Sequence, residues 1–428
     1  MTPERILFGD FELDATNFEL RRGPTRIKLE RIPMDLLILL ARNEGRLVQR
    51  TEVVETIWGK GRFLETDSAI NTAIRKVRRA LGDNPTHPIM IDTIPGKGYR
   101  FIAIGTRQGA ADNAKALYAK GLHFWNRKTP DSYLQAIQFF QESIDSDPEY
   151  AMPYLGLAKT WILFGIHGLQ PSADVYPRAR AAASKALELD SQLAEAYAAM
   201  ADVIKGYDWD WEGAESYYQR ALKIDPKCGI AHQWYANLLS IVGRHNEAIQ
   251  HASEARTLDP LSVGATGFVG FTYFRARRYQ EALRESESAL TLEPNSPIAN
   301  WFLGQVLTTL KRFPEAEIAF SKAVEESHAA SMYLSALGYL YATSGDRVRA
   351  SEILARLQCR SLEHYVSPLD IAIVSAAMGE MDAAFECLNT AVQGRVMRLT
   401  ELTMPMFDSL RDHPQFHALL IKLALNAG

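Results

Sequence analysis

A short motif that ends in an acidic residue and a proline recurs between residues 144 and 328 of this chain of 428 residues, with weaker copies among the repeats. Residues 221–226, 255–260 and 289–294 read ALKIDP, ARTLDP and ALTLEP, and they follow one another at steps of 34 residues. Weaker copies stand at 186–191 (ALELDS) and 323–328 (AVEESH), and IDSDP at 144–148 begins the series. A fixed period of this length predicts small structural units stacked in a row, since each unit buries its apolar face only against its neighbours.

Small residues recur inside each repeat, where two helices have to approach closely, at offsets of 12 and 7 residues. They are Ala236, Ala248 and Ala255, then Gly270, Ala282 and Ala289, then Gly304, Ala316 and Ala323, and finally Gly338 and Ala350. A step of 34 residues is the tetratricopeptide period. We therefore predict an all-α tetratricopeptide solenoid of about eight helix pairs at residues 114–393. Residues 394–428 are expected to form amphipathic capping helices that close it.

The first 105 residues follow a different pattern. Short β-like runs at residues 6–8, 11–13, 18–21 and 27–29 alternate with turn residues and predict a small antiparallel sheet. Two helices are expected next, one opened by Pro33 and one capped by Thr51. A third helix at residues 68–81 precedes two β-rich runs around Pro95-Gly96-Lys97-Gly98, which predict a hairpin.

The helix at residues 68–81 has two distinct faces. Ile70, Ile74, Val77 and Leu81 share one apolar stripe, and Gly82 follows as a C-cap. The opposite face carries Ser68, Thr72, Arg75, Lys76 and Arg79, with Asn71 and Arg78 on its flanks. A helix with four cations and no acid between Ser68 and Leu81 suits a reader of the DNA groove, although a solvated basic surface is the simpler interpretation of any single such helix.

The order of the elements supports DNA binding. Residues 5–104 resemble the DNA-binding domain of OmpR/PhoB-type bacterial regulators in the segments LILLARNEGRLVQRTEVVETIWG, SAINTAIRKVRRALGDN and TIPGKGYRFIA. The predicted fold is thus an α+β winged helix-turn-helix domain at residues 1–105, a linker at 106–113 and the all-α tetratricopeptide solenoid. A winged helix followed by such an array is also similar to the HilA-like cytoplasmic transcriptional regulators.

The resemblance implies a set of residues that contact double-stranded DNA. The basic helix would enter the major groove with Thr72, Arg75, Lys76 and Arg79, accompanied by Ser68, and Asn71 could reach an adenine edge. Arg50, Thr51 and Arg100 are placed for phosphates. Pro95 stands where many family members have a basic residue in the wing, and Lys97 is the expected substitute.

Further partners follow from the resemblance and from charge. The segment from Gly59 to Asp67 resembles the part of the family that contacts RNA polymerase, which implies an activator. Residues 1–107 carry four more Lys and Arg than Asp and Glu, whereas the rest of the chain carries eight more acids than bases, so only the first part should attract phosphate. The solenoid groove is suited to a protein or peptide, with Asn237, Tyr273, Asn300 and Tyr339 as candidates. A homodimer is a further partner that the sequence leaves open.

Other function classes find no support in the sequence. No phosphate loop, HExxH, GxSxG or zinc spacing is present, and the three cysteines lie far apart, so we expect no enzyme, no cofactor and no metal. The first residues lack the apolar run of a signal peptide, and no uncharged run reaches membrane-spanning length, so a cytoplasmic protein is expected. The alternative to a transcription regulator is a non-catalytic scaffold in which the winged helix docks protein.

Overall fold

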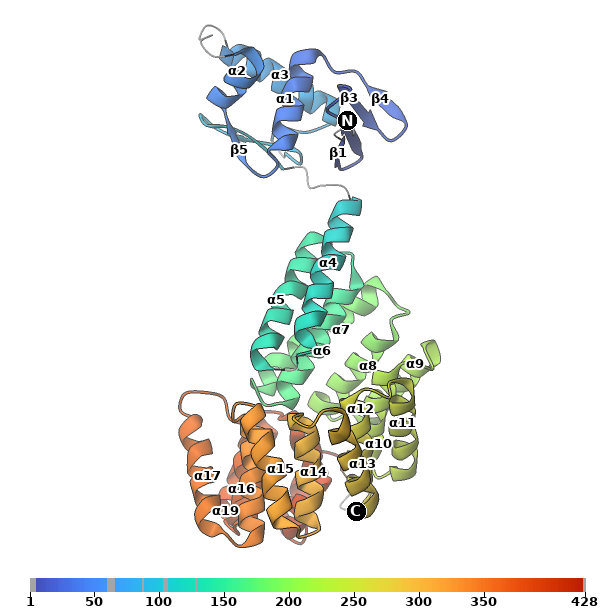
Figure 1. The fold of residues 1–428 in the computed structure, drawn as a ribbon, viewed down its shortest axis with the longest axis vertical. Helices are drawn as coiled ribbons and strands as arrows, with labels where there is room; N and C mark the ends of the chain where they lie inside the picture. Colours follow the sequence, from blue (N-terminus) through green and yellow to red (C-terminus); the bar gives the residue numbers. More distant parts are fainter. Residues whose placement is uncertain (1–4, 60–65, 87, 103–106, 128, 426–428) are drawn as a thin grey trace. The chain divides into compact units, whose positions relative to one another are not determined.

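The computed structural model describes residues 5–59, 66–86, 88–102, 107–127 and 129–425 (Figure 1). The chain forms two compact units. The first consists of Met1–Ala116 with Asp145–Asp147, and the second of Leu117–Ile144 with Pro148–Gly428.

The first unit begins with a four-stranded antiparallel sheet whose strands neighbour one another in chain order. The strands are β1 (Arg5–Phe8), β2 (Phe11–Asp14), β3 (Glu19–Arg22) and β4 (Thr25–Ile27). The Asp14 carboxylate accepts hydrogen bonds from the backbone N–H groups of Thr16 and Asn17 and so builds the turn between β2 and β3. The predicted N-terminal sheet is confirmed.

Three helices and a second sheet complete this unit. The elements are α1 (Arg31–Arg42), β5 (Leu47–Gln49), α2 (Arg50–Trp58), α3 (Thr66–Leu81), β6 (Ile91–Ile94) and β7 (Gly98–Phe101). The predicted hairpin is β6 and β7, and β5 adds to the free edge of β7. A Cβ atom on Gly98 would lie 2.1 Å from the carbonyl oxygen of Val48, so this pairing requires glycine. The sequence pattern missed β5, because three residues are too few to show an alternation.

The core of the first unit contains the apolar stripe predicted for the basic helix. Ile70, Ile74, Val77 and Leu81 are all buried. The expected cap at Thr51 is wrong: the N-cap residue of α2 is Gln49, two residues earlier, and the described residues provide no side-chain hydrogen bond that caps this helix. Thr51 lies exposed in the first turn instead.

From Arg107 onward the described chain is built from paired helices, most of which belong to the second unit (Figure 1). The described residues form eight pairs: α4 (Arg107–Trp125) with α5 (Pro130–Ser146), α6 (Ala151–Ile166) with α7 (Ser172–Leu189), α8 (Ala194–Val203) with α9 (Trp211–Ile224), α10 (Gly229–Ile241) with α11 (His245–Leu258), α12 (Val263–Arg275) with α13 (Tyr279–Leu292), α14 (Pro297–Thr309) with α15 (Phe313–Glu326), α16 (Ser331–Ser344) with α17 (Arg347–Arg360), and α18 (Pro368–Ala377) with α19 (Met381–Gln393). Most of the segment expected as a linker at residues 106–113 is helical, since α4 begins at Arg107.

The small residues of the repeat mark the close contacts inside each pair, as predicted. A Cβ atom on Gly270 would lie 2.8 Å from the Ser286 hydroxyl, and one on Gly304 would lie 2.5 Å from the Phe320 ring. Ala282 and Ala316, on the second helices, are fully buried. A larger side chain at any of these positions would push two helices apart, which explains why the repeat has small residues there.

The C-terminal segment, residues 394–425, does more than cap the last pair. It contains the 3₁₀ helices η2 (Met397–Thr403) and η3 (Pro405–Leu410) and the helix α20 (Pro414–Lys422). Helix α20 packs on α19, as a cap would, whereas η2 contacts α6, α10 and the π-helical turn η1 (Ile204–Asp208), and η3 contacts α18. The segment therefore covers part of the face formed by the first helices of the pairs.

Polar contacts hold this segment in place. The Trp211 indole N–H donates to the carbonyls of Leu423 and Ala424, so this tryptophan ties the start of α9 to the end of the C-terminal segment. Arg398 is buried, and its guanidinium pairs with Asp370 at 2.6 Å and with Glu401 at 2.9 Å. Of the predicted groove residues, Asn300 is buried and donates to the carbonyls of Pro294 and Ser296, which is a structural role.

Candidate nucleic-acid interface

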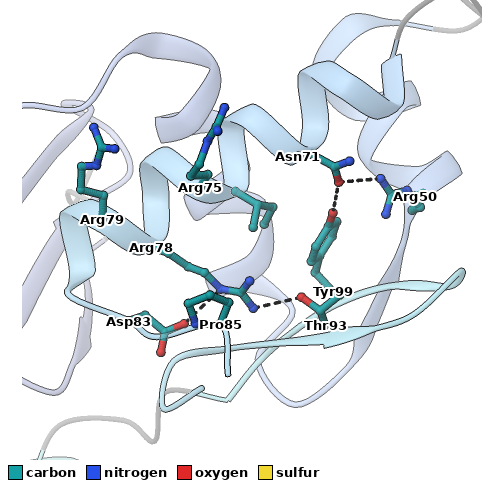
Figure 2. A pocket seen from close by; sticks show the side chains of 10 residues that line it. Arg50, Asn71, Arg75, Arg78, Arg79, Asp83, Pro85, Thr93 and Tyr99 are labelled. Carbon is teal, nitrogen blue, oxygen red and sulfur yellow. Dashed lines mark hydrogen bonds and ion pairs between the residues drawn. The ribbon is translucent and has the colours of Figure 1, made fainter. Parts of the chain in front are cut away.

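The exposed face of α3 presents two arginines without a partner in the described part of the chain. Arg75 and Arg79 are exposed, and no hydrogen bond or ion pair of their side chains occurs among the described residues. Both side chains project from the helix without a drawn contact, whereas Arg78 points toward the hairpin (Figure 2). Ser68 is exposed about two turns before Arg75 on the same helix, and Thr72 is half-buried. Arg75 and Arg79 are thus free to pair with an external acceptor.

Lys76 lies on the same helix but is already paired. Its ammonium group is 2.7 Å from both carboxylate oxygens of Glu30, the residue that precedes α1. Both side chains remain partly exposed, so the pair contributes about 0–1 kcal/mol and water competes with it. Lys76 could therefore exchange Glu30 for a phosphate at small cost.

Arg50 and Asn71 form one cluster with the hairpin (Figure 2). The Arg50 guanidinium donates to Asp67 at 2.9 Å and to the Asn71 side-chain oxygen at 2.8 Å, and it lies over the Tyr99 ring. The Tyr99 hydroxyl also donates to that Asn71 oxygen, at 3.0 Å. A two-point contact with adenine needs both the oxygen and the nitrogen of an asparagine side chain. In this arrangement the Asn71 oxygen is already engaged by two donors.

Arg78 joins the helix to the hairpin and is not a surface cation. It donates to the Ile91 carbonyl at 2.6 Å and to the Thr93 hydroxyl at 2.9 Å, and it faces the buried Asp83 carboxylate at 3.4 Å. Asp83 in turn accepts backbone hydrogen bonds from residues 89–91. The sequence placed Arg78 on the flank but missed Tyr99 and Asp83, whose contacts depend on the hairpin folding back onto α3.

A hollow of about 480 Å³ lies between α3 and the hairpin. Its lining includes four arginines, Arg50, Arg75, Arg78 and Arg79, and a single acid, Asp83. Since Asp83 pairs with Arg78, the hollow keeps a net positive charge and suits a phosphate or a base edge rather than an apolar ligand.

The wing contributes Lys97 more clearly than Arg100. Lys97 is exposed in the turn between β6 and β7, and its carbonyl accepts a hydrogen bond from the Arg50 backbone N–H, which fixes the wing beside the start of α2. Arg100 is half-buried. Strand alternation places Arg100 on the face of the sheet opposite Tyr99, so the structure does not bring it together with the cations of α3. The segment with the expected polymerase contact, residues 59–67, lies mostly outside the described residues.

Two charges near the start of α2 neutralise each other. Arg46 pairs with Glu52, and the hydrogen bond from Arg46 lowers the pKa of the Glu52 carboxyl.

Within the described ranges, no group of three or more histidine, cysteine, aspartate or glutamate side chains is arranged to hold a metal ion. Nor does any helix described there have the length and apolar character needed to cross a membrane.

Comparison with known families places both parts of the chain. Residues 24–101 match the family model described as "Transcriptional regulatory protein, C terminal". This part is an OmpR/PhoB-type winged-helix DNA-binding domain. Residues 272–331 match the tetratricopeptide repeat model, and the predicted fold class is confirmed in both parts.

Two bacterial regulators are among the relatives whose similarity to this chain covers about 90 residues. The transcriptional regulatory protein KdpE of Mycobacterium tuberculosis is 33% identical over 93 residues, which cover 22% of this chain and 41% of the relative. HprR of Escherichia coli is 34% identical over 92 residues, covering 22% and 40%. The chain thus spans about 40% of the length of these relatives.

Solved structures resemble each part separately. The DNA-binding domain of RstA from Klebsiella pneumoniae, solved in complex with the RstA box, is 30% identical, with 23% of this chain and 96% of that chain covered and a TM-score of 0.22. PilF of Pseudomonas aeruginosa is 22% identical, with 53% and 97% covered and a TM-score of 0.37.

Proposed function

We propose that the protein is a sequence-specific DNA-binding transcription regulator in which α3 enters the major groove. The observation that carries this proposal is a pair of arginines on the exposed face of α3, Arg75 and Arg79, that have no ion pair or hydrogen bond with the part of the chain that the structure describes, in a domain of this family. An arginine that faces a guanine can donate to both O6 and N7. Because neither side chain has a hydrogen-bond or ion-pair partner among the described residues to give up, binding a base costs them mainly their hydration and side-chain freedom.

The remaining predicted residues serve phosphates in this proposal. Lys97 on the wing and Lys76 on the helix edge contribute charge, while Ser68, Thr72 and Thr51 donate hydroxyl hydrogens. Arg50 is held by Asp67, Asn71 and Tyr99, so it meets a phosphate in a fixed orientation. Asn71 accordingly acts by holding Arg50, and an adenine contact would require it to release two donors. Arg100 remains a candidate for a phosphate approached from the other face of the wing.

We further propose that the protein activates transcription and that its repeat array binds a partner protein or peptide. Support for the first comes from the resemblance of residues 59–67 to a polymerase-contacting segment. Support for the second comes from the repeat architecture, whose first helices form the usual binding face. Residues 397–410 occupy part of that face, so a partner would bind the remainder or displace this segment. A homodimer and a cytoplasmic location are parts of the same proposal.

A direct binding experiment tests the DNA-binding role. The intact protein is used to capture sheared genomic DNA at physiological salt, and enriched fragments are then titrated by fluorescence anisotropy against random duplex across a range of salt concentrations. Preferred fragments, with an affinity that falls steeply as salt rises, are expected. If no fragment is preferred over random duplex, the regulator proposal fails and the scaffold alternative stands.

A reporter experiment tests activation. A captured fragment placed upstream of a reporter gene should give higher expression with the intact protein than without it. Arg75→Ala should abolish the increase at an unchanged protein level. Lower expression in the presence of the intact protein would instead identify a repressor.

A further inference from the structure

A cavity of about 670 Å³ lies in the second unit. Three segments line it: the end of α10 with the turn to α11, the end of α12 with the turn to α13, and the C-terminal segment. The polar residues that matter below are Ser240, His245, Arg275, Arg277, Asp408 and Arg411. The volume falls in the range of about 300–1,000 Å³ that is typical of small-molecule sites.

The charges around this cavity do not balance. Arg277 donates two hydrogen bonds to Asp408, at 2.8 and 2.7 Å, and Arg411 donates to the same carboxylate at 2.6 Å. One carboxylate thus serves two arginines. No ion pair of Arg275 occurs among the described residues; its guanidinium donates to the Thr400 carbonyl and the Thr403 hydroxyl at 3.2–3.4 Å.

Arg275 is nevertheless buried, with only 7% of its surface exposed. A buried cation that lacks an opposite charge is costly to the folded protein. Burial accordingly lowers the pKa of Arg275 to about 10, against a weaker opposing effect of Glu401. A negatively charged ligand bound beside Arg275 would offset the cost of burying its charge.

Three of the residues that line this cavity also carry a buried polar atom without a hydrogen-bond partner among the described residues. These atoms are the Nε atom of Arg275, the Nδ1 atom of His245 and the hydroxyl oxygen of Ser240. Buried polar groups in folded proteins are almost always hydrogen-bonded, so three such atoms on residues that line one cavity form an unusual cluster. All three groups can act as hydrogen-bond donors.

We propose that this cavity binds a small molecule through an anionic carboxylate or phosphate group, with Arg275 as its charge partner and Ser240 and His245 as hydrogen-bond donors. Thr403, Asp408 and Arg411 belong to the C-terminal segment, so an occupied cavity links that segment to α12. A bound ligand therefore stabilises the arrangement in which the C-terminal segment covers part of the face formed by the first helices of the pairs. This inference is independent of the proposed role in transcription.

Hydrogen exchange measured by mass spectrometry tests the proposal on the intact protein. Inorganic phosphate and citrate are added in separate titrations, with sodium chloride at the same ionic strength as the reference. Slower exchange is expected in residues 240–245, 275–278 and 403–411, and the thermal midpoint should rise with probe concentration. Protection by phosphate alone assigns a phosphate group, and protection by citrate alone assigns a carboxylate; either supports the site.

Matched variants identify the residue responsible. Arg275→Met should weaken the apparent affinity by about tenfold or more, because it removes a charge-assisted hydrogen bond. Arg284→Met, on the exposed face of α13, makes the same change in charge and should leave the affinity unaltered. Ala276→Leu keeps Arg275 and fills part of the cavity, so it should also weaken binding and remains informative if the first variant fails to fold.

Three results would overturn the proposal. One is that neither probe protects the cavity segments. Another is protection confined to residues 66–81, which would place the anion on the DNA-binding helix. The third is that a variant aimed at the cavity binds the probe undiminished: either Arg275→Met is protected as much as Arg284→Met, or a folded Ala276→Leu protein keeps the affinity of the unaltered protein.

Discussion

Arg75 and Arg78 are three residues apart on one helix, yet the structure predicts opposite outcomes for their replacement by alanine. Arg75 is exposed, and its side chain forms no hydrogen bond or ion pair with the described residues, so Arg75→Ala should change the free energy of unfolding by no more than about 0.5 kcal/mol. At the DNA it should cost about 1–3 kcal/mol. This corresponds to a roughly 5- to 160-fold loss of affinity for the preferred duplex.

Arg78→Ala removes the same charge but a different set of contacts. The side chain donates to Ile91 and Thr93 and offsets the buried charge of Asp83. Its loss leaves that carboxylate buried with backbone donors only, which should destabilise the domain by about 3 kcal/mol. Binding of DNA should then weaken through partial unfolding, and equally for preferred and random duplex.

Two measurements separate these outcomes. Fluorescence anisotropy with preferred and random duplexes gives the discrimination, and hydrogen exchange of residues 66–81 gives the local stability of α3. Arg75→Ala should lose discrimination with unchanged exchange, and Arg78→Ala should show faster exchange. The reasoning is refuted if Arg75→Ala keeps its discrimination within about twofold, well below the range for one base contact, or if α3 exchanges no faster after Arg78→Ala.

Further predictions concern the second unit. Burial lowers the pKa values of His245 and His251 below 6.5, so the stability that the neutral imidazoles provide above pH 6.5 should be lost as the pH falls through their folded-state values. Replacing both histidines by glutamine should therefore reduce the change in thermal midpoint between pH 7.5 and 5.5, and an unchanged dependence on pH would contradict this. Cys359 is exposed, whereas burial raises the pKa of Cys228 to about 11, so iodoacetamide at pH 8 should label Cys359 first by peptide mass spectrometry, and equal labelling would disprove the predicted burial. Arg398→Met leaves two buried carboxylates without their cation and should cost about 3–5 kcal/mol in urea denaturation. A loss under about 1 kcal/mol would show that this ion-pair network contributes little to stability.

The sequence by itself determined the architecture, because the relevant signals are local. The step of 34 residues and the recurring small residues predicted paired helices, and Gly270 and Gly304 do lie where two helices touch. The spacing of Ile70, Ile74, Val77 and Leu81 predicted which face of α3 is buried, and all four are buried. Such patterns follow from helix geometry and from the exclusion of apolar side chains from water, and both act over a few residues.

Only the tertiary structure decided which cations are free. The sequence shows four similar cations on α3, namely Arg75, Lys76, Arg78 and Arg79. In the folded chain Lys76 pairs with Glu30, which is 46 residues away, and Arg78 donates a hydrogen bond to Thr93 in the later hairpin. No local pattern records a partner so distant in sequence.

The same limit applied to the C-terminal segment. This segment was expected to form capping helices. Its residue Thr400 accepts a hydrogen bond from Arg275, 125 residues earlier in the chain, and this contact helps to form the charged cavity. Electrostatic pairing depends on distance in space and on burial, and the folded chain sets both.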